Sequence, residues 1–197
     1  MKKIIAIALT VLMLASLMAG CGSSEANELN TVEAGKLIMS TNAAFPPYEM
    51  VADDGSFEGI DVEIAGAIAQ KLGLELVVDD MDFDAALLAV QQKKSDIVMA
   101  GVSVTEDRLL VMNFSDSYAT GVQVVIVKEG SDVTMDNLGE KMIGCQRGTT
   151  GYIYASDSPE NGGYGEDHVT AFDNGASAEL TADGTVQAII DKYISAE

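Results

Sequence analysis

Residues 37–100 decide the fold. In order they contain LIMST (37–41), DVEIAGAIAQKL (61–72), LELVV (74–78), DAALLAVQQ (84–92) and DIVMA (96–100). The first, third and last of these are short apolar runs with the length of buried strands, and the two segments between them have apolar residues at helical spacing. The sequence therefore predicts β-α-β-α-β, an order typical of a parallel sheet with helices on both faces.

The first predicted helix carries a regular apolar stripe. Its members are spaced four residues apart, which places them on one face of a helix: Ile60, Ile64, Ile68 and Leu72. We expect Asp61 to cap this helix and Gly73 to end it. In the second helix, Leu87, Leu88 and Val90 are the expected core face.

Ligands of parallel sheets bind beyond the carboxyl ends of the strands. Three segments directly follow predicted strands: the loop that holds Phe45, the corner at residues 82–83 and the turn at residues 101–103. We expect these segments to converge at one edge of the sheet.

The second half of the chain predicts a smaller α/β lobe. Strands are expected at residues 122–127, where the run VQVVIV is strongly β-branched, and at 142–145 and 168–172. A short helix is expected over residues 152–155. From Gly175 onward the chain reads as one helical segment that Gly184 interrupts.

The N-terminus has the pattern of an export signal. A basic start precedes an apolar run that is too short for a stable membrane span, and small residues precede Cys21. Residues 1–20 are predicted as a lipoprotein signal peptide, Cys21 as the lipidated first residue of the mature protein and residues 21–35 as a flexible tether. The alternative is an ordinary cleaved signal in which the cysteine is incidental.

Composition excludes several kinds of site. The formal net charge is −20, which argues against nucleic acid binding and against docking on anionic lipid. The only other cysteine, Cys145, is expected to be a free buried thiol. The single histidine, His168, excludes most histidine-based metal sites and catalytic triads, and we expect no metal and no cofactor.

Arg108 is the sharpest candidate for binding chemistry. A guanidinium offers a rigid fork of donors that matches a carboxylate, and Ser103 can add a hydroxyl and a backbone N–H to the same oxygens. The alternative from spacing alone is that Thr105 caps a short helix and that Arg108 forms a surface ion pair.

Two weaker signals lie nearby. Gly148 and Thr149 lead into a predicted helix, whose free N–H groups suit an anion. Phe45 and Phe83 can sandwich an apolar or planar side chain, and plain core packing is the alternative for both.

These residues together resemble the polar amino-acid family of extracytoplasmic solute-binding proteins of ABC importers. The motifs that match in order and spacing are AFPPYE (44–49), GIDVEIA (59–65), DFD (82–84), SVTEDR (103–108), NFSDSY (113–118), GTT (148–150) and DGTV (183–186). The resemblance implies two lobes that close on an amino acid, with lobe one at 36–119, lobe two at 120–178 and a first crossing at 118–121. It also implies delivery to a permease from the outer face of the cell membrane, with lipid as the only membrane anchor.

The resemblance also assigns roles to site residues. Arg108 and Ser103 would hold the α-carboxylate with help from the backbone of Thr149, and the carbonyl of Gly101 would accept from the α-ammonium. The side chain of the ligand would pack on Phe45 and Phe83, and Asn42 would tune its polarity.

The chain departs from the family after Ala178. Roughly 60 residues of lobe two and of the return to lobe one are absent, including the aspartate that binds the ammonium, so lobe two is expected to be incomplete. Residues 179–197 fit the closing helix of the family, and Asp173 is the nearest surviving acid.

Three functions follow from this resemblance. The first is a lipid-anchored amino-acid-binding protein, and the second is a truncated lipoprotein that binds no ligand. The third is an enzyme on the same fold, such as a dehydratase of cyclic amino-acid precursors, which the absent segment disfavours.

Overall fold

The computed structural model describes residues 29–175. The predicted signal peptide, Cys21 and the closing helix at 179–197 lie outside these residues. The chain divides into two units, Met1–Asn30 and Thr31–Glu197, and every helix and strand described here belongs to the second. Within residues 29–175, no helix is long and apolar enough to cross a membrane.

A three-stranded parallel sheet forms the centre of the first half. It contains β1 (Lys36–Thr41), β5 (Glu75–Asp80) and β6 (Ile97–Val98) in the order β5-β1-β6. In this register Met39 of β1 lies between Val78 and Ile97. The predicted strands at 37–41, 74–78 and 96–100 are confirmed, although β6 is shorter than expected.

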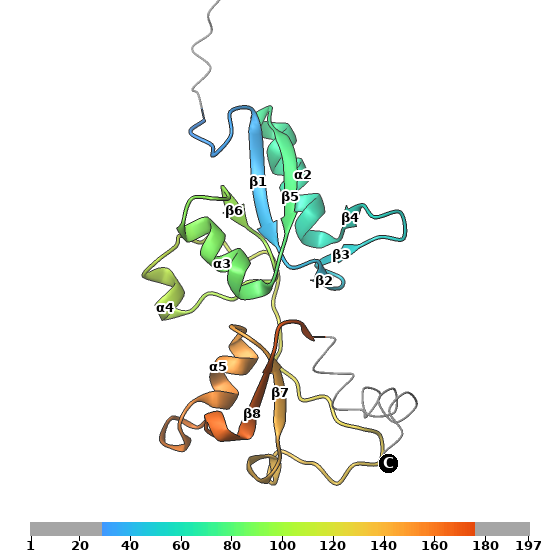
Figure 1. Cartoon of the computed structure of the whole chain (residues 1–197), viewed down its shortest axis with the longest axis vertical. Helices are drawn as coiled ribbons and strands as arrows, with labels where there is room; N and C mark the ends of the chain where they lie inside the picture. The colour runs from blue at the N-terminus through green and yellow to red at the C-terminus, as the bar shows by residue number, and fades with distance from the viewer. Residues whose placement is uncertain (1–28, 176–197) are drawn as a thin grey trace, which may run out of the picture. The chain divides into compact units, whose positions relative to one another are not determined.

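Helices α2 (Ile60–Leu72) and α3 (Phe83–Gln91) cover opposite faces of this sheet (Figure 1). Met39 packs with Ala65 of α2, whereas the hydroxyl of the next residue, Ser40, donates to the carbonyl of Ala86 in α3. Successive strand residues point to opposite faces. The mostly parallel α/β architecture with helices on both faces is therefore confirmed.

The apolar stripe predicted for α2 is only partly right. Ile60, Ile68 and Leu72 are exposed, while Ala65 and Ala69 are buried. The small alanines let the helix backbone approach the sheet closely, so the larger side chains beside them stay outside. In the same way α3 buries Phe83, Ala86 and Ala89 and leaves Leu88 exposed.

Asp61 does not cap α2. The N-cap is Gly59, and Asp61 is a fully buried residue of the first turn. Gly73 ends the helix in a left-handed conformation, as predicted.

A small antiparallel sheet follows β1, where the sequence suggested only loop and turn. It consists of β2 (Ala44–Phe45), β3 (Glu49–Val51) and β4 (Phe57–Glu58) in the order β2-β3-β4. These strands have two or three residues each, too few to show an alternating pattern in the sequence. They place Phe45 and Glu49 beside the carboxyl end of β1.

The second half is built on two parallel strands, β7 (Ile143–Gln146) and β8 (Val169–Phe172). The helix α5 (Thr150–Ser156) packs on both. These elements confirm the strands predicted at 142–145 and 168–172 and the helix predicted at 152–155. The remaining short helices are α4 (Glu106–Leu109), η1 (Leu138–Glu140), η2 (Pro159–Asn161) and η3 (Glu166–His168).

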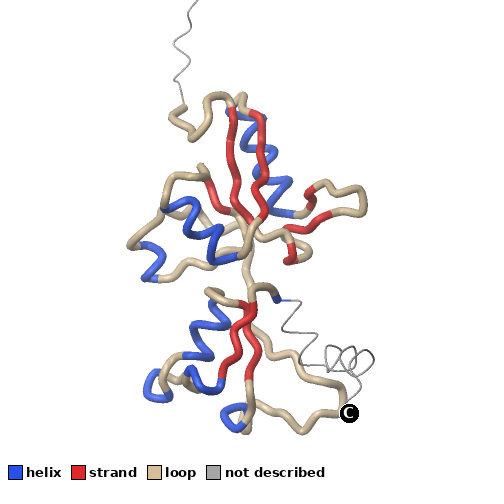
Figure 2. The backbone as a smooth tube through the Cα atoms, in the orientation of Figure 1, coloured by secondary structure: helices blue, strands red, loops and turns tan. Residues whose placement is uncertain are grey.

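The strand predicted at 122–127 is absent. Residues 111–137 form neither helix nor strand, and Figure 2 shows this stretch as loop. Val122 and Val124 are 82% and 73% exposed. A β-branched run becomes a strand only when another strand supplies its backbone partners, and none of residues 29–175 does so here. This matches the shortened lobe two.

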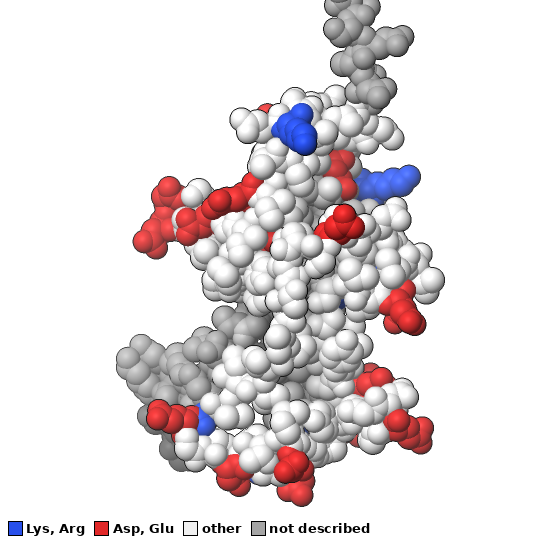
Figure 3. All heavy atoms as spheres, turned by 180° about the vertical axis from the view of Figure 1, so that it is seen from behind, with Lys and Arg blue, Asp and Glu red and all other residues white. Residues whose placement is uncertain are grey.

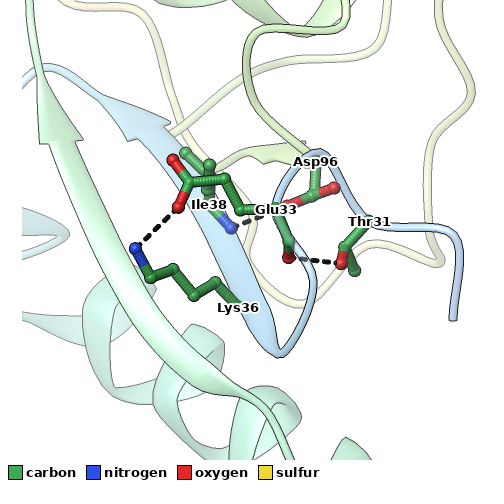
Figure 4. A network of polar contacts seen from close by, with 5 residues as sticks. All are labelled: Thr31, Glu33, Lys36, Ile38 and Asp96. Atoms are coloured by element: carbon green, nitrogen blue, oxygen red, sulfur yellow. Dashed lines mark hydrogen bonds and ion pairs between the residues drawn. The ribbon is translucent and has the colours of Figure 1, made fainter.

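Asp96 joins the chain before β1 to the turn before β6. Its carboxylate accepts from the backbone N–H groups of Val32 (2.7 Å) and Ile38 (2.8 Å), and the second contact is drawn in Figure 4. Beside it Lys36 pairs with Glu33 at 2.6 Å, and the Thr31 hydroxyl donates to the carbonyl of Glu33. Residues 31–35, the end of the predicted tether, are held against the sheet by these contacts.

The surface reflects the acidic composition. On the face seen in Figure 3, acidic side chains are spread widely and basic ones are few. With a net charge of −20, the chain repels polyanions.

Two glycines of the α2 region provide a test of the packing. Gly59 has φ +125°, and a Cβ there would lie 2.3 Å from the carbonyl oxygen of Tyr48. We expect Gly59→Ala to lower the free energy of unfolding by about 2 kcal/mol or more, because backbone would have to shift. Urea unfolding followed by circular dichroism measures this.

Gly66→Ala is the matched control. Gly66 lies in the middle of α2, and a Cβ there meets no atom within 4 Å. We expect this change to raise the free energy of unfolding by about 0.5–1 kcal/mol. Equal effects of the two substitutions would contradict the packing described for Gly59.

Candidate functional site

A cavity of about 600 Å³ is the candidate site. This volume lies within the range of roughly 300–1,000 Å³ that is usual for small-molecule pockets. All seven predicted ligand-binding residues line it: Asn42, Phe45, Phe83, Gly101, Ser103, Arg108 and Thr149.

Arg108 is buried, at 8% exposure, on the short helix α4. The hydroxyl of Thr105 accepts from the backbone N–H of Arg108, so the predicted cap is present. The alternative of a surface ion pair is not observed, because Arg108 has no acidic partner among residues 29–175. The burial of Arg108 lowers its pKa.

Backbone carbonyls hold the Arg108 guanidinium in place. Nη1 donates to the carbonyl of Ser103 at 2.7 Å and Nη2 to that of Gly148 at 3.0 Å. The guanidinium lies 5.6 Å from the centre of the Phe83 ring, within cation–π distance. A guanidinium has five N–H donors, so these two bonds leave others for an anion in the pocket.

The loop before α5 approaches α3 closely. Gly148 has φ +74°, and a Cβ there would lie 3.2 Å from the Cβ of Asp84. Thr149 is the N-cap of α5: its hydroxyl accepts from Tyr152 N–H and donates to the carbonyl of Gln146. The backbone N–H of Thr149 is 3.4 Å from the same carbonyl, a long contact.

The two predicted aromatic residues differ in their environment. Phe83 is buried at 7% exposure beneath Arg108, so the core-packing interpretation fits it as well. Phe45 is 48% exposed and stacks on Tyr48, with ring centres 5.3 Å apart. Its ring lies against Gly101, where a Cβ would come within 2.7 Å of it. Phe45 therefore offers an aromatic face to the cavity.

Amide side chains link Asn42, the residue after β1, to Gln146 of β7 at another wall of the cavity. Asn42 donates to the carbonyl of Met81 and accepts from Gln146 at 2.8 Å. Both ends of the Asn42 amide are thus engaged. Asp173 does not line the cavity; it pairs with Arg147 at 3.6 Å.

A buried acidic pair lies at the cavity: Glu49 lines it and Asp61 does not. Nothing in the sequence pattern pointed clearly to this pair. Glu49 and Asp61 are both fully buried. Asp61 accepts from the backbone N–H of Gly101 and from the hydroxyl of Tyr118, both at 2.9 Å. Burial, and secondarily the hydrogen bond to Asp61, raises the pKa of Tyr118.

Glu49 has an unusual environment for a carboxyl group. No donor in the described part of the chain reaches either of its oxygens. Burial, followed by the negative charge of Asp61, raises the pKa of Glu49 to about 9. Glu49 therefore keeps its proton at neutral pH.

The described residues contain no group of three or more potential metal ligands. Cys145 is a free, half-buried thiol, as expected, and its burial raises its pKa.

Comparison with known proteins identifies related chains. Residues 37–196 match the model of the bacterial extracellular solute-binding proteins, family 3. The arginine-binding extracellular protein ArtP of Bacillus subtilis is 34% identical over 182 residues, which cover 90% of this chain and 69% of that protein. The L-cystine-binding protein TcyJ of Escherichia coli K12 is 34% identical over 149 residues, 72% of this chain and 56% of that protein.

Solved structures agree with these matches. The arginine-bound form of truncated ArgBP from T. maritima superposes with a TM-score of 0.69 at 34% identity, covering 81% of this chain and 79% of that one. Each relative is longer than the part that this chain matches.

The buried carboxyl of Glu49 predicts a pH-dependent stability. Its pKa is about 9 in the folded protein and near 4.5 in the unfolded chain, so folding takes up a proton between these values. This contribution to stability is fully present below pH 4.5 and is lost as the pH rises toward 9. We expect the free energy of unfolding of the native chain, relative to Glu49→Gln, to fall by about 1.4 kcal/mol per pH unit in this range.

Urea titrations of both chains from pH 5 to pH 9 measure the difference. The Gln variant keeps the shape of the side chain and a donor for Asp61, and other carboxyl groups contribute equally to both chains. Parallel stability curves would show that Glu49 does not hold a proton in the folded state.

Proposed function

The chain belongs to the bacterial extracellular solute-binding proteins, family 3, and we propose that it binds one amino acid for delivery to an ABC transporter permease. The observation that carries this proposal is the buried guanidinium of Arg108 at the wall of the cavity, with no acidic partner among residues 29–175. A buried charge without a counter-charge is costly, and an anionic ligand would supply that counter-charge.

The α-carboxylate of an amino acid fits this role. Two N–H groups of Arg108 are fixed by the carbonyls of Ser103 and Gly148, so the side chain is oriented before the ligand arrives. A fixed guanidinium binds a carboxylate with two parallel hydrogen bonds and loses little freedom on binding. The exposed side chain of Ser103 adds a hydroxyl at the same place.

The ligand side chain would lie on the open face of Phe45. A ring face attracts aliphatic stems and cationic groups alike. The acidic surface favours a cationic ligand over an acidic one. Because one relative is named for arginine and another for cystine, we propose a polar L-amino acid as ligand and L-arginine as the first to test.

The α-ammonium has weaker partners. Gly101, whose carbonyl would accept from the ammonium, lines the cavity, but Asp173 is engaged with Arg147, and Glu49 is uncharged at neutral pH. Asp116, an exposed residue of the cavity wall, is the acid left to balance the ammonium. We therefore expect weaker binding than a complete second lobe would give.

Lipid anchoring at Cys21 completes the proposal. A single lipidated residue at the outer face of the cell membrane would keep the protein near its permease. The support is the sequence before Cys21 together with the family, whose name describes extracellular binding proteins.

A non-binding, truncated lipoprotein is the second candidate. The exposed run at residues 122–127 favours it, because this part of the second lobe forms no strand. The backbone of that wall of the second lobe is then not held by a sheet. For an enzyme on this fold no feature of the cavity supplies a comparable argument, and the relatives named above are binding proteins.

Calorimetric titration with L-arginine and a panel of other amino acids tests the proposal. We expect Arg108→Lys to weaken binding by about 10- to 100-fold, because an ammonium lacks the two-pronged geometry for a carboxylate. Arg147→Lys is the control: Arg147 is exposed and outside the cavity, and its loss should change the affinity by less than about twofold.

The outcomes separate the two candidates. Heat from at least one amino acid, lost in Arg108→Lys and kept in Arg147→Lys, supports binding through Arg108. A folded sample that gives no heat with any amino acid supports the non-binding lipoprotein instead.

The anchor has its own test. In a bacterial host grown with radiolabelled palmitate, we expect label on the native chain and on Cys145→Ala, and none on Cys21→Ala. Cys145 is half-buried in β7 and is the other cysteine of the chain, so it is the matched control. Label that persists in Cys21→Ala would contradict anchoring at Cys21.

A further inference from the structure

The acidic pair at the cavity connects four segments of the chain. Glu49 is on β3 and Asp61 is in the first turn of α2, and neither is exposed. The two groups that donate to the Asp61 carboxylate are the N–H of Gly101, in the turn beyond β6, and the hydroxyl of Tyr118. Both donors belong to residues that line the cavity.

Each oxygen of Asp61 has a separate task. Oδ2 accepts from the N–H of Gly101, a residue of the cavity wall whose φ is +56°. Oδ1 accepts from Tyr118, in the segment that runs from α4 toward β7. Asp61 thus orients two walls of the cavity without lining it.

Glu49 completes the arrangement. Its oxygens are fully buried and meet no donor from the described residues. The titratable groups that influence it or lie around it are Asp61 of α2, Tyr118, the neighbouring Tyr48 and the exposed Glu58 of the adjacent strand β4. Of these, Asp61 lies next to it in the fold: the N–H of Asp61 donates to the carbonyl of Tyr48, the residue before Glu49, at 2.9 Å.

We propose that Glu49 and Asp61 form a proton-sharing carboxyl pair that positions Gly101 and Tyr118 for ligand capture. Asp61 is a positioning residue, because it acts on the ligand through Gly101 and Tyr118. Glu49, a residue of the cavity wall, acts through Asp61. The proposal rests on the proposed amino-acid-binding function, which it deepens by naming residues that set the shape of the same cavity.

In this proposal, the contact between Glu49 and Asp61 depends on the proton of Glu49. With the proton present, Glu49 donates to Asp61 and the pair carries a single negative charge, which Gly101 and Tyr118 stabilise. Once the proton leaves, two buried carboxylates repel each other. Asp61 then has to move or recruit water, and Gly101 loses its anchor.

The first experiment needs no ligand. The ¹⁵N-labelled full-length chain is titrated from pH 6 to pH 10, and the amide signal of Gly101 is followed by NMR. We expect this signal to shift with a midpoint near the pKa of Glu49, which is about 9, and to stay in place in Glu49→Gln. The same titration curve in both chains, or no shift in either, would overturn the proposal.

The second experiment measures the affinity for L-arginine at pH 7 and at pH 10. Between these values we expect the affinity of the native chain to fall about tenfold relative to that of Glu49→Gln. The α-ammonium of arginine titrates in the same range, but it does so equally with both chains and cancels in the comparison. A constant ratio of the two affinities would overturn the positioning role.

Variants of the partners separate positioning from folding. We expect Asp61→Asn to weaken arginine binding at pH 7 by tenfold or more, and Tyr118→Phe, which removes one hydrogen bond, to weaken it about threefold. If Asp61→Asn does not fold, Tyr118→Phe and Glu49→Gln still decide the matter. A Tyr118→Phe chain with native affinity would show that Tyr118 is not positioned for the ligand.

Failure of the proposed function gives a different result. If the native chain binds no arginine or other amino acid at pH 7, the binding function is wrong, whereas the Gly101 signal still reports on the carboxyl pair. An unshifted Gly101 signal together with normal binding would refute the pair alone.

Discussion

The buried carboxylate of Asp61 is the constraint on which the site depends. It lies in the first turn of α2, where the partial positive charge of the helix N-terminus favours a negative group. Its two oxygens bind Gly101 after β6 and Tyr118 beyond α4, segments far apart in the sequence. A charge buried in this way is tolerated because hydrogen bonds surround it, and those bonds in turn fix the edge of the sheet where the cavity opens.

Much of the first half could be predicted because its elements are local patterns. The apolar runs that become β1 and β5 and the glycine that ends α2 depend on neighbours in the sequence. Whether Ile68 or Ala65 is buried depends on how closely α2 approaches the sheet. This distance cannot be predicted from the spacing of apolar residues in the sequence. The run at 122–127 fails for a related reason: strand propensity has no effect without a partner strand.

The site was predictable to the extent that it uses residues with distinctive chemistry. Arg108, Phe45 and Gly101 stand in motifs that place them after strands, and the structure brings them to one cavity. Glu49 and Asp61 were not recognised, because an acid beside Tyr48 reads as a surface residue and an acid at the start of a helix reads as a cap. Only burial distinguishes them, and burial comes from β2, β3 and β4, which are too short to leave a pattern.

The charges around the cavity imply that the two charged ends of an amino-acid ligand would be attracted with different strength. At the carboxylate end stands Arg108, buried and fixed by two carbonyls, so its electrostatic attraction is screened little by solvent. At the proposed ammonium end the cavity would offer the carbonyl of Gly101, a protonated Glu49 and the exposed Asp116, whose charge water and salt screen strongly. Because a protonated acid can still accept a hydrogen bond but offers no charge, recognition of the carboxylate dominates. If the proposed function holds, the ligand would therefore be selected by its carboxylate and by the fit of its side chain to Phe45, more than by its ammonium group.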